Sequence, residues 1–203
     1  MNDKLETYRS KRDFHSTREP SGNSGRRKGG RRFVIQKHDA SRLHYDFRLE
    51  IDGVLVSWAV PKGLSTDPGE KRLAIRTEDH PLEYLDFEGV IPKDEYGGGT
   101  VMIWDTGPYR NLLANRGKDS HSMEDSLEDG LIEVWLDGEK LRGGFALKRT
   151  EGGKKPRWLA IKMKDEHADA RRNPVSTETK SVASGRDLDE IAREEANEQV
   201  GLT

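Results

Sequence analysis

Two histidines and an aspartate lie close together in the segment HDASRLHYDFRLEIDG, residues 38–53. His44 and Asp46 belong to a run in which apolar and polar side chains alternate, so on a β-strand both would face one side, about 6–7 Å apart. His38 ends the preceding apolar run, and the short link between the runs would fold it back beside His44. The three side chains could bind one divalent ion and leave positions open for water or substrate.

Arg48 follows Asp46 on the same face of this predicted strand. Its planar, permanently charged guanidinium suits phosphate oxygens and could stabilise the charge that develops during phosphoryl transfer. Because the chain has no cysteine, a metal site must use imidazole and carboxylate ligands, and Mn²⁺ is the natural candidate. The pattern favours phosphate ester chemistry. The alternative is that the alternating charges form only the solvated face of a strand.

A second group of polar side chains follows another predicted strand, in the segment RTEDHPLEYLDFEG, residues 76–89. His80 could bind or protonate an ester oxygen, and Tyr84 could donate a hydrogen bond to the same phosphate. The alternative for each of them is helix capping or simple exposure. His121 lies in an acidic loop and His167 in a polar C-terminal segment, so both are left out of the predicted site.

Short segments rich in β-branched and aromatic residues must position these side chains. They are separated by Gly, Pro and Asp turns, which predicts a mainly β fold, an antiparallel sandwich or barrel of about eight strands. The Asp-Gly pairs at 52–53 and 137–138 predict tight hairpins, and EYGGGT (95–100) predicts a turn or bulge because no P-loop lysine follows it. The predicted strands are residues 31–38, 43–51, 54–60, 72–77, 99–107, 131–136, 140–150 and 157–163, and four tryptophans within them are assigned to the interior: Trp58, Trp104, Trp135 and Trp158.

Composition divides the 203-residue chain into three parts. Residues 1–32 are a polar arm that ends in the basic run RRKGGRR (26–32), whose cations could neutralise the phosphates of a nucleic acid. A solvated linker is the alternative for this run, and the arm could become ordered on binding. Residues 33–164 hold the predicted strands, and residues 165–203 form a polar tail.

The tail is acidic, with ten acidic and five basic side chains in residues 165–203 of a chain whose net charge is −2. Within residues 187–199, Leu188, Ile191 and Ala192 have helical spacing and form a narrow apolar stripe. The stripe is compatible with a short partner-docking helix, but a fraying tail is the favoured interpretation.

The sequence also indicates where the chain works. Its N-terminus lacks the apolar run of a signal peptide, and no segment approaches the ~20 apolar residues that span a bilayer. The absence of cysteine suits a reducing compartment. We therefore expect a cytoplasmic protein without membrane contact, associated with the nucleoid only through its substrate, and we favour a monomer.

Beyond these local patterns, the chain resembles the 3′-phosphoesterase domain of bacterial ligase D and its stand-alone relatives, from about residue 8 to residue 167. The resemblance rests on the segments KRDF, FVIQKHDASRLHYDFRLEIDGVLVSWAVPKG, EDHPLEYLDFEGVIP, YGGGTVMIWDTG and RGGFALKR. It implies a small antiparallel β-barrel enzyme, with short helices and polar extensions, that heals DNA 3′ ends during break repair by non-homologous end joining. The implied steps are removal of a terminal ribonucleoside by a phosphodiesterase reaction and then of the remaining 3′-phosphate.

The resemblance also implies roles for particular residues and partners. His38, His44 and Asp46 would be metal ligands, usually for manganese, and the scissile phosphate would be contacted by Arg48, His80 and Tyr84. Five further residues would support the ribonucleoside step: Arg12, Asp13, Glu19, Gln36 and Glu78. The implied partners are DNA 3′ ends and, from the family alone, a separate ATP-dependent DNA ligase and Ku.

Two other functions remain open from the residues. A His-x-Asp pair on a β-barrel with a distant histidine is also the ligand pattern of Fe(II)-dependent oxygenases, and His80 or His121 would then be the third ligand. A non-catalytic module that binds nucleic-acid ends through the basic arm is the second alternative. The nature of the product, or its absence, separates the three functions.

Overall fold

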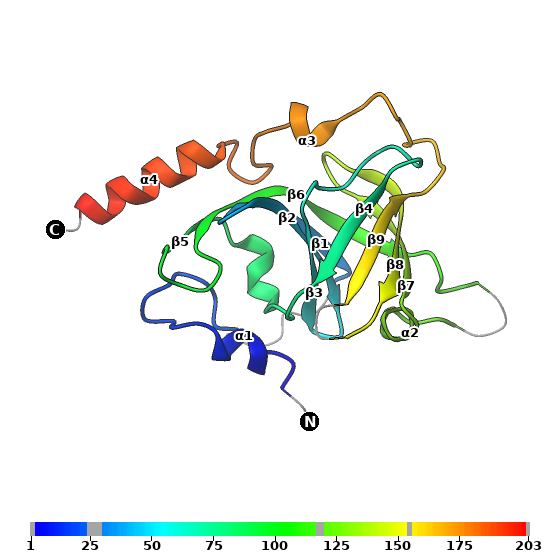
Figure 1. The fold of residues 1–203 in the computed structure, drawn as a ribbon, viewed down its shortest axis with the longest axis horizontal. Helices are drawn as coiled ribbons and strands as arrows, with labels where there is room; N and C mark the ends of the chain where they lie inside the picture. The colour runs from blue at the N-terminus through cyan, green and yellow to red at the C-terminus, as the bar shows by residue number, and fades with distance from the viewer. Residues whose placement is uncertain (1–2, 24–29, 117–119, 154–155, 202–203) are drawn as a thin grey trace.

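The computed structural model of the chain describes residues 3–23, 30–116, 120–153 and 156–201 (Figure 1). Within these residues the helices are α1 (Glu6–Ser10), the 3-10 helix η1 (Leu82–Asp86), α2 (Met123–Asp129), α3 (Pro174–Thr177) and α4 (Leu188–Gly201). The strands are β1 (Arg32–Asp39), β2 (Leu43–Ile51), β3 (Val54–Val60), β4 (Lys71–Arg76), β5 (Gly89–Ile91), β6 (Gly99–Asn111), β7 (Leu131–Asp137), β8 (Arg142–Glu151) and β9 (Arg157–Lys162).

The strands form a closed antiparallel barrel. Eight of them pair in the order β1-β2-β3-β4-β9-β8-β7-β6, and the pairing of β1 with β6 closes the ring. Closure removes the unpaired edges that an open sheet would expose. The mainly β fold with about eight barrel strands is therefore confirmed. The short strand β5, which pairs with β6 outside the ring, was not predicted because its three residues are too few to show a periodicity.

Strand β2 separates the core from the polar cluster of residues singled out in the sequence. Its alternate apolar residues lie in the main hydrophobic core: Tyr45, Phe47, Leu49 and Ile51. His44, Asp46 and Arg48 consequently face the outside of the barrel. Asp46 and Arg48 are nevertheless only 6% and 3% exposed, so the solvated-face alternative is wrong for these two side chains.

A second hydrophobic cluster covers this outer face. It is formed by residues of α1, β1, β3, η1 and β6: Tyr8, Val34, Leu55, Leu82, Tyr84, Leu85 and Ile103. Figure 1 shows α1 and β5 on the same side of the barrel. The side chain of Tyr8 is fully buried, and its hydroxyl donates a hydrogen bond to the backbone oxygen of Pro20 at 2.8 Å. The described part of the arm is thus packed on the barrel, whereas the sequence suggested an arm that orders on binding; most of the basic run 26–32 lies outside the described residues.

The C-terminal segment also packs on the barrel before α4 projects beyond it (Figure 1). The indole Nε1 of Trp104 donates to the backbone oxygen of Glu178 at 2.6 Å, and the Glu88 carboxylate accepts the Ser181 hydroxyl at 2.6 Å. Ile191 of α4 is fully buried in the main core. The favoured interpretation of a fraying tail is therefore wrong, because the apolar stripe docks on the chain itself. No helix among the described residues is long and apolar enough to cross a membrane.

The tryptophans differ in their placement. Trp58, Trp104 and Trp158 are buried, as predicted. Trp135 is only half-buried, because Ile132 and Val134 on alternate positions of β7 point into the core and Trp135 faces outward. Its ring lies against the Arg110 guanidinium, 5.3 Å from the ring centroid, and against the His167 ring.

The two Asp-Gly pairs form different turns. Asp52 and Gly53 make the predicted two-residue hairpin between β2 and β3, with φ angles of 46° and 79°. The prediction at 137–138 is wrong, because Asp137 pairs with Arg142 across a four-residue connection. A buried carboxylate on β6 organises that connection: Asp105 accepts the backbone N–H groups of Glu139, Lys140 and Leu141 at 2.9, 3.1 and 2.8 Å.

Removal of the Asp105 carboxylate should destabilise the barrel. In an Asp105→Ala variant these three backbone N–H groups lose their acceptor, which is expected to lower the free energy of unfolding by about 3 kcal/mol. Urea denaturation followed by tryptophan fluorescence measures the change. The exposed Asp137→Ala, in the same turn, serves as the control and should change stability by less than about 0.5 kcal/mol; equal losses in the two variants would argue against this role of Asp105.

Candidate active site

Three candidate metal ligands meet on the outer face of the barrel. Strands β1 and β2 pair so that His38 lies directly opposite His44, with ring centroids 4.8 Å apart. The Asp46 Oδ2 atom is 3.5 Å from His38 Nδ1 and 3.6 Å from His44 Nε2. One ligand atom from each of the three residues lies within 4.8 Å of the others. The structure therefore brings together the three residues that the sequence grouped around a single ion.

The hydrogen bonding of the imidazoles indicates that a cation fits this cluster. His44 Nδ1 lies 2.9 Å from the backbone oxygen of Arg42, and because a carbonyl can only accept, Nδ1 carries the hydrogen. In the neutral ring, the lone pair of Nε2 then points toward the Asp46 carboxylate, which is favourable only with a cation between them. His38 Nε2 is buried and has no hydrogen-bond partner within the described part of the chain. Two imidazoles and a carboxylate suit a divalent transition metal ion.

The charges around Asp46 keep it ionised. Burial would raise the pKa of Asp46, but the Arg48 guanidinium, together with His38 and His44, holds that pKa well below its usual value. Burial would likewise lower the pKa of His44, whereas the neighbouring Asp46 raises it above the ordinary histidine value. The raised pKa favours a second proton on the His44 ring, at Nε2. A divalent ion bound there would displace that proton, since metal-binding imidazoles are unprotonated at the ligating nitrogen.

Arg48 is fixed beside the cluster by three contacts. Its Nε donates to Gln36 Oε1 at 2.8 Å, its Nη1 donates to Ser57 Oγ at 2.9 Å, and its Nη2 lies 3.2 Å from Asp46 Oδ2. Because a guanidinium has five N–H groups, Nη1 and Nη2 each keep one for a further acceptor. Ser57 was not predicted as part of the site. The sequence does distinguish Ser57, because it is the one polar residue in the apolar segment VLVSWAV.

His80 approaches from the segment before η1. Its backbone exchanges two hydrogen bonds with Leu55 of β3, at 2.8 and 3.0 Å. His80 Nδ1 lies 3.0 Å from the backbone oxygen of Glu78 and so carries the hydrogen, which leaves Nε2 as an acceptor, 3.5 Å from Arg12 Nη2. Burial and the nearby cations Arg48 and Arg12 lower the pKa of His80 well below its ordinary value, so the ring is neutral.

These side chains line one cavity of about 300 Å³. All three candidate metal ligands and all three candidate phosphate contacts lie in its wall, together with two of the five supporting residues, Arg12 and Glu78. The exposed carboxylate of Asp13 does not line the cavity. It accepts the backbone N–H of His15 at 3.0 Å and so holds a turn of the arm.

Glu19 and Gln36 lie behind the cavity wall rather than in it. Glu19 Oε1 accepts Arg12 Nε at 2.9 Å and the Tyr84 hydroxyl at 2.8 Å. Gln36 accepts Arg48 Nε and donates to the backbone oxygens at 84 and 87. The Tyr84 hydroxyl hydrogen is thus already used within the protein, although its ring packs against His80 with centroids 4.8 Å apart.

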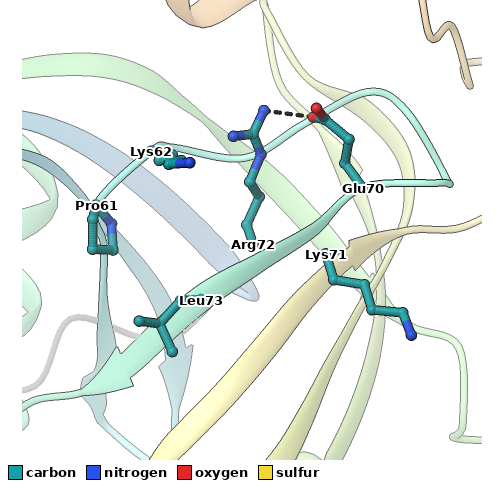
Figure 2. A pocket seen from close by; sticks show the side chains of 6 residues that line it. All are labelled: Pro61, Lys62, Glu70, Lys71, Arg72 and Leu73. Carbon is teal, nitrogen blue, oxygen red and sulfur yellow. Dashed lines mark hydrogen bonds and ion pairs between the residues drawn. The ribbon is translucent and has the colours of Figure 1, made fainter.

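Another surface pocket lies beside the start of β4 (Figure 2). Its lining consists of Pro61, Lys62, Glu70, Lys71, Arg72 and Leu73, and it shares none of these residues with the site cavity. The guanidinium of Arg72 is paired with the Glu70 carboxylate, as the dashed line in Figure 2 shows. Since this pocket is lined by neither histidine nor tyrosine, the candidate chemistry belongs to the cavity around Asp46.

Known proteins resemble this chain in sequence. Residues 36–149 match the family described as the DNA ligase D 3′-phosphoesterase domain. The chain is 52% identical over 167 residues to the multifunctional non-homologous end joining protein LigD of Pseudomonas aeruginosa, which covers 81% of this chain and 19% of that protein. It is 51% identical over 165 residues to the protein of that name from Mycolicibacterium smegmatis, covering 81% and 21%. The identity to the multifunctional non-homologous end joining DNA repair protein LigD of Mycobacterium tuberculosis is 48% over 165 residues, covering 81% and 20%. The chain spans about a fifth of the length of these relatives.

Binding of Mn²⁺ should stabilise the folded protein through the three-residue cluster. At a free metal concentration of 100 times the dissociation constant, the free energy of unfolding is expected to rise by about 2.7 kcal/mol. Thermal unfolding of chelator-treated protein, with and without added MnCl₂, measures the shift. We expect His44→Ala to lose most of it, because one of three ligands is gone.

The matched control for that measurement is His121→Ala. His121 pairs with Asp129 at 3.0 Å and does not belong to the cluster, so its removal should leave the metal-induced shift unchanged. An undiminished shift in His44→Ala would rule out the cluster as the metal site.

Proposed function

The chain belongs to the DNA ligase D 3′-phosphoesterase domain family, and on that basis we propose that it hydrolyses phosphate esters at the 3′ ends of DNA. The proposed reactions are a phosphodiesterase step that removes a 3′-terminal ribonucleoside and a phosphomonoesterase step that removes the remaining 3′-phosphate. The observation that carries the proposal is that candidate metal ligands and a candidate phosphate-binding group lie side by side in one cavity. A cluster suited to a divalent ion lies beside the Arg48 guanidinium, which keeps N–H groups for a phosphate.

The metal that we propose is Mn²⁺, held by His38, His44 and Asp46. When bound, such an ion supplies Lewis acidity toward a phosphoryl oxygen and toward the attacking water. The protein orients two of the three proposed ligands before any ion arrives, because His44 is oriented by the backbone oxygen of Arg42 and Asp46 by Arg48.

Two side chains would act on the phosphate and the proton. Arg48 would direct the remaining N–H groups of Nη1 and Nη2 at the equatorial oxygens, where negative charge accumulates during transfer. Neutral His80 would accept a proton of the attacking water at Nε2, since its Nδ1 hydrogen is held by the backbone oxygen of Glu78. The same nitrogen would then return the proton to the leaving alkoxide oxygen of the ester. Tyr84, whose ring contacts His80 and whose hydroxyl is bound by Glu19, would fix the orientation of that imidazole.

The ribonucleoside step needs a group that detects a 2′-hydroxyl, and we assign this role to Glu78. Its carboxylate lines the cavity and would accept the hydroxyl hydrogen. Although burial raises the pKa of Glu78, its own backbone N–H and Lys11 hold it below the ordinary value, so the acceptor is ionised. Arg12 would contact the phosphate, while Asp13, Glu19 and Gln36 would act indirectly through the arm, Arg12 and Arg48.

The biological setting follows from the names of the relatives. Because these describe non-homologous end joining and DNA repair, we propose that this chain prepares broken DNA ends at the nucleoid for an ATP-dependent DNA ligase and Ku. Residues 33–164 would be the catalytic barrel, and residues 1–32 would complete its site. Residues 165–203 would be an acidic extension packed on the barrel.

End-labelled duplexes test the proposed function directly. Duplexes that end in a 3′-ribonucleotide or a 3′-phosphate are incubated with the purified protein, with and without Mn²⁺. We expect both products with the metal and neither without it, and we expect His44→Ala to abolish both activities while His121→Ala keeps them.

The other two functions predict different results in the same assay. Oxygen consumption with ferrous iron and a 2-oxo acid, without phosphate release, would support the oxygenase. Tight binding of the duplexes with no product at any metal concentration would support a non-catalytic end-binding module.

The planar guanidinium of Arg48, and not only its positive charge, should be essential for activity. We expect Arg48→Lys to lower kcat by about 100-fold, because an ammonium cannot contact Gln36, Ser57, Asp46 and a phosphate together. Single-turnover kinetics on the 3′-phosphate duplex measures the loss. Arg110→Lys on the exposed side of β6 is the control and should retain full activity; an unchanged kcat in Arg48→Lys would refute the assignment.

A further inference from the structure

An exposed aromatic ring lies at the mouth of the catalytic cavity. Tyr96, in the loop between β5 and β6, is 49% exposed and is the most exposed large hydrophobic residue in the described part of the chain. It lines the cavity around Asp46 and also a neighbouring groove of about 630 Å³. The cavity and the groove share four lining residues: Ala59, Thr77, Glu78 and Tyr96. A strand that passes from the groove into the cavity would therefore cross a boundary to which the ring of Tyr96 belongs.

The loop that carries Tyr96 is tightly packed against β1. A Cβ atom at Gly99 would lie 2.2 Å from the backbone oxygen of Asp39, and one at Gly98 would lie 2.5 Å from the backbone oxygen of Pro92. The backbone N–H of Gly98 also donates to the oxygen of Glu95 at 3.0 Å. Gly99 thus allows close contact with Asp39, the last residue of β1, and Gly98 allows the loop to close on Pro92.

Cations surround the ring. The Lys11 ammonium lies 4.5 Å from the ring centroid and donates a hydrogen bond to the Tyr96 hydroxyl at 3.2 Å. The Arg12 guanidinium carbon is 5.5 Å from the same centroid. Lys11 is itself held by Glu78 Oε2 at 3.1 Å, so the charge stays beside the ring. An aromatic face combined with backbone-attracting cations is the combination that binds single-stranded nucleic acid without sequence preference.

We propose that Tyr96 is the stacking platform for the base of the 3′-terminal nucleotide. The inference rests on the proposed function, because a 3′-phosphate held at Arg48 places its own nucleoside at the cavity mouth. Stacking on the ring positions the ester, while Lys11 and Arg12 attract the phosphate backbone. Tyr96 is a positioning residue, since it contacts the base and not the reacting phosphorus, and it accepts any base because each has an aromatic face.

Steady-state kinetics on two substrates tests the platform. We expect Tyr96→Ala to raise KM for a 3′-phosphate oligonucleotide about tenfold with little change in kcat, and Tyr96→Phe to stay close to wild type because the ring remains. On an oligonucleotide whose terminal sugar lacks a base, Tyr96→Ala and wild type should have equal KM. Leu73→Ala is the matched control, because Leu73 is an exposed apolar residue that lines neither the cavity nor the groove. A KM in Tyr96→Ala within twofold of wild type on the normal substrate would overturn the proposal.

A binding measurement separates this inference from the proposed function. An oligonucleotide with a 3′-terminal 2-aminopurine is added in the presence of EDTA, so that the readout does not need turnover. Quenching of its fluorescence by wild type and Tyr96→Phe, but not by Tyr96→Ala, supports stacking. Equal quenching by all three proteins refutes it. If wild type forms no product from either ester, the proposed function fails, whereas the quenching still decides the role of Tyr96.

Discussion

One buried carboxylate sets the demands that the surrounding structure meets. Asp46 is almost inaccessible on the outer face of the barrel, where an unpaired charge would cost several kcal/mol. Arg48 and the two imidazoles compensate that charge, and Arg48 is in turn held by Gln36 and Ser57. Each of the strands β1, β2 and β3 therefore contributes polar groups to one network. Within the described residues the network leaves one buried polar atom, His38 Nε2, without a hydrogen-bond partner, and this atom belongs to the cluster that we propose as the metal site.

The fold can bury this network because the barrel does not depend on its outer face for a core. The interior is filled by the apolar residues that alternate with the site residues, so the outer face of β1–β3 can be covered separately. The arm and η1 provide that cover and bring a second buried pair, Arg12 with Glu19, whose atoms lie 2.9 Å apart. Exclusion of water strengthens every charge interaction in the cavity, including those that a phosphate would make.

The sequence predicted the part of the site that depends on local periodicity. Alternation along β2 places His44, Asp46 and Arg48 on one face whatever the fold, and a short link can only return His38 beside them. What it could not predict is which distant segments cover that face. The contact of Arg12 with His80 joins residues 68 positions apart, and the Tyr84 hydroxyl reaches Glu19 across 65 positions. The turn held by Asp105 and the docking of α4 were missed for the same reason, because tertiary contacts override local signals.

In the function that we propose, the placement of His80 would couple substrate binding to proton transfer. Its pKa is depressed by burial and then by Arg48 and Arg12, the two cations that a bound phosphate would neutralise. A phosphate ester bound beside them would offset that repulsion and so raise the pKa of His80 in the complex. The proposed base, Nε2 of the neutral imidazole, would thereby become more basic in the complex than in the free protein. The two guanidinium groups that we propose to hold the ester would thus also control the basicity of His80.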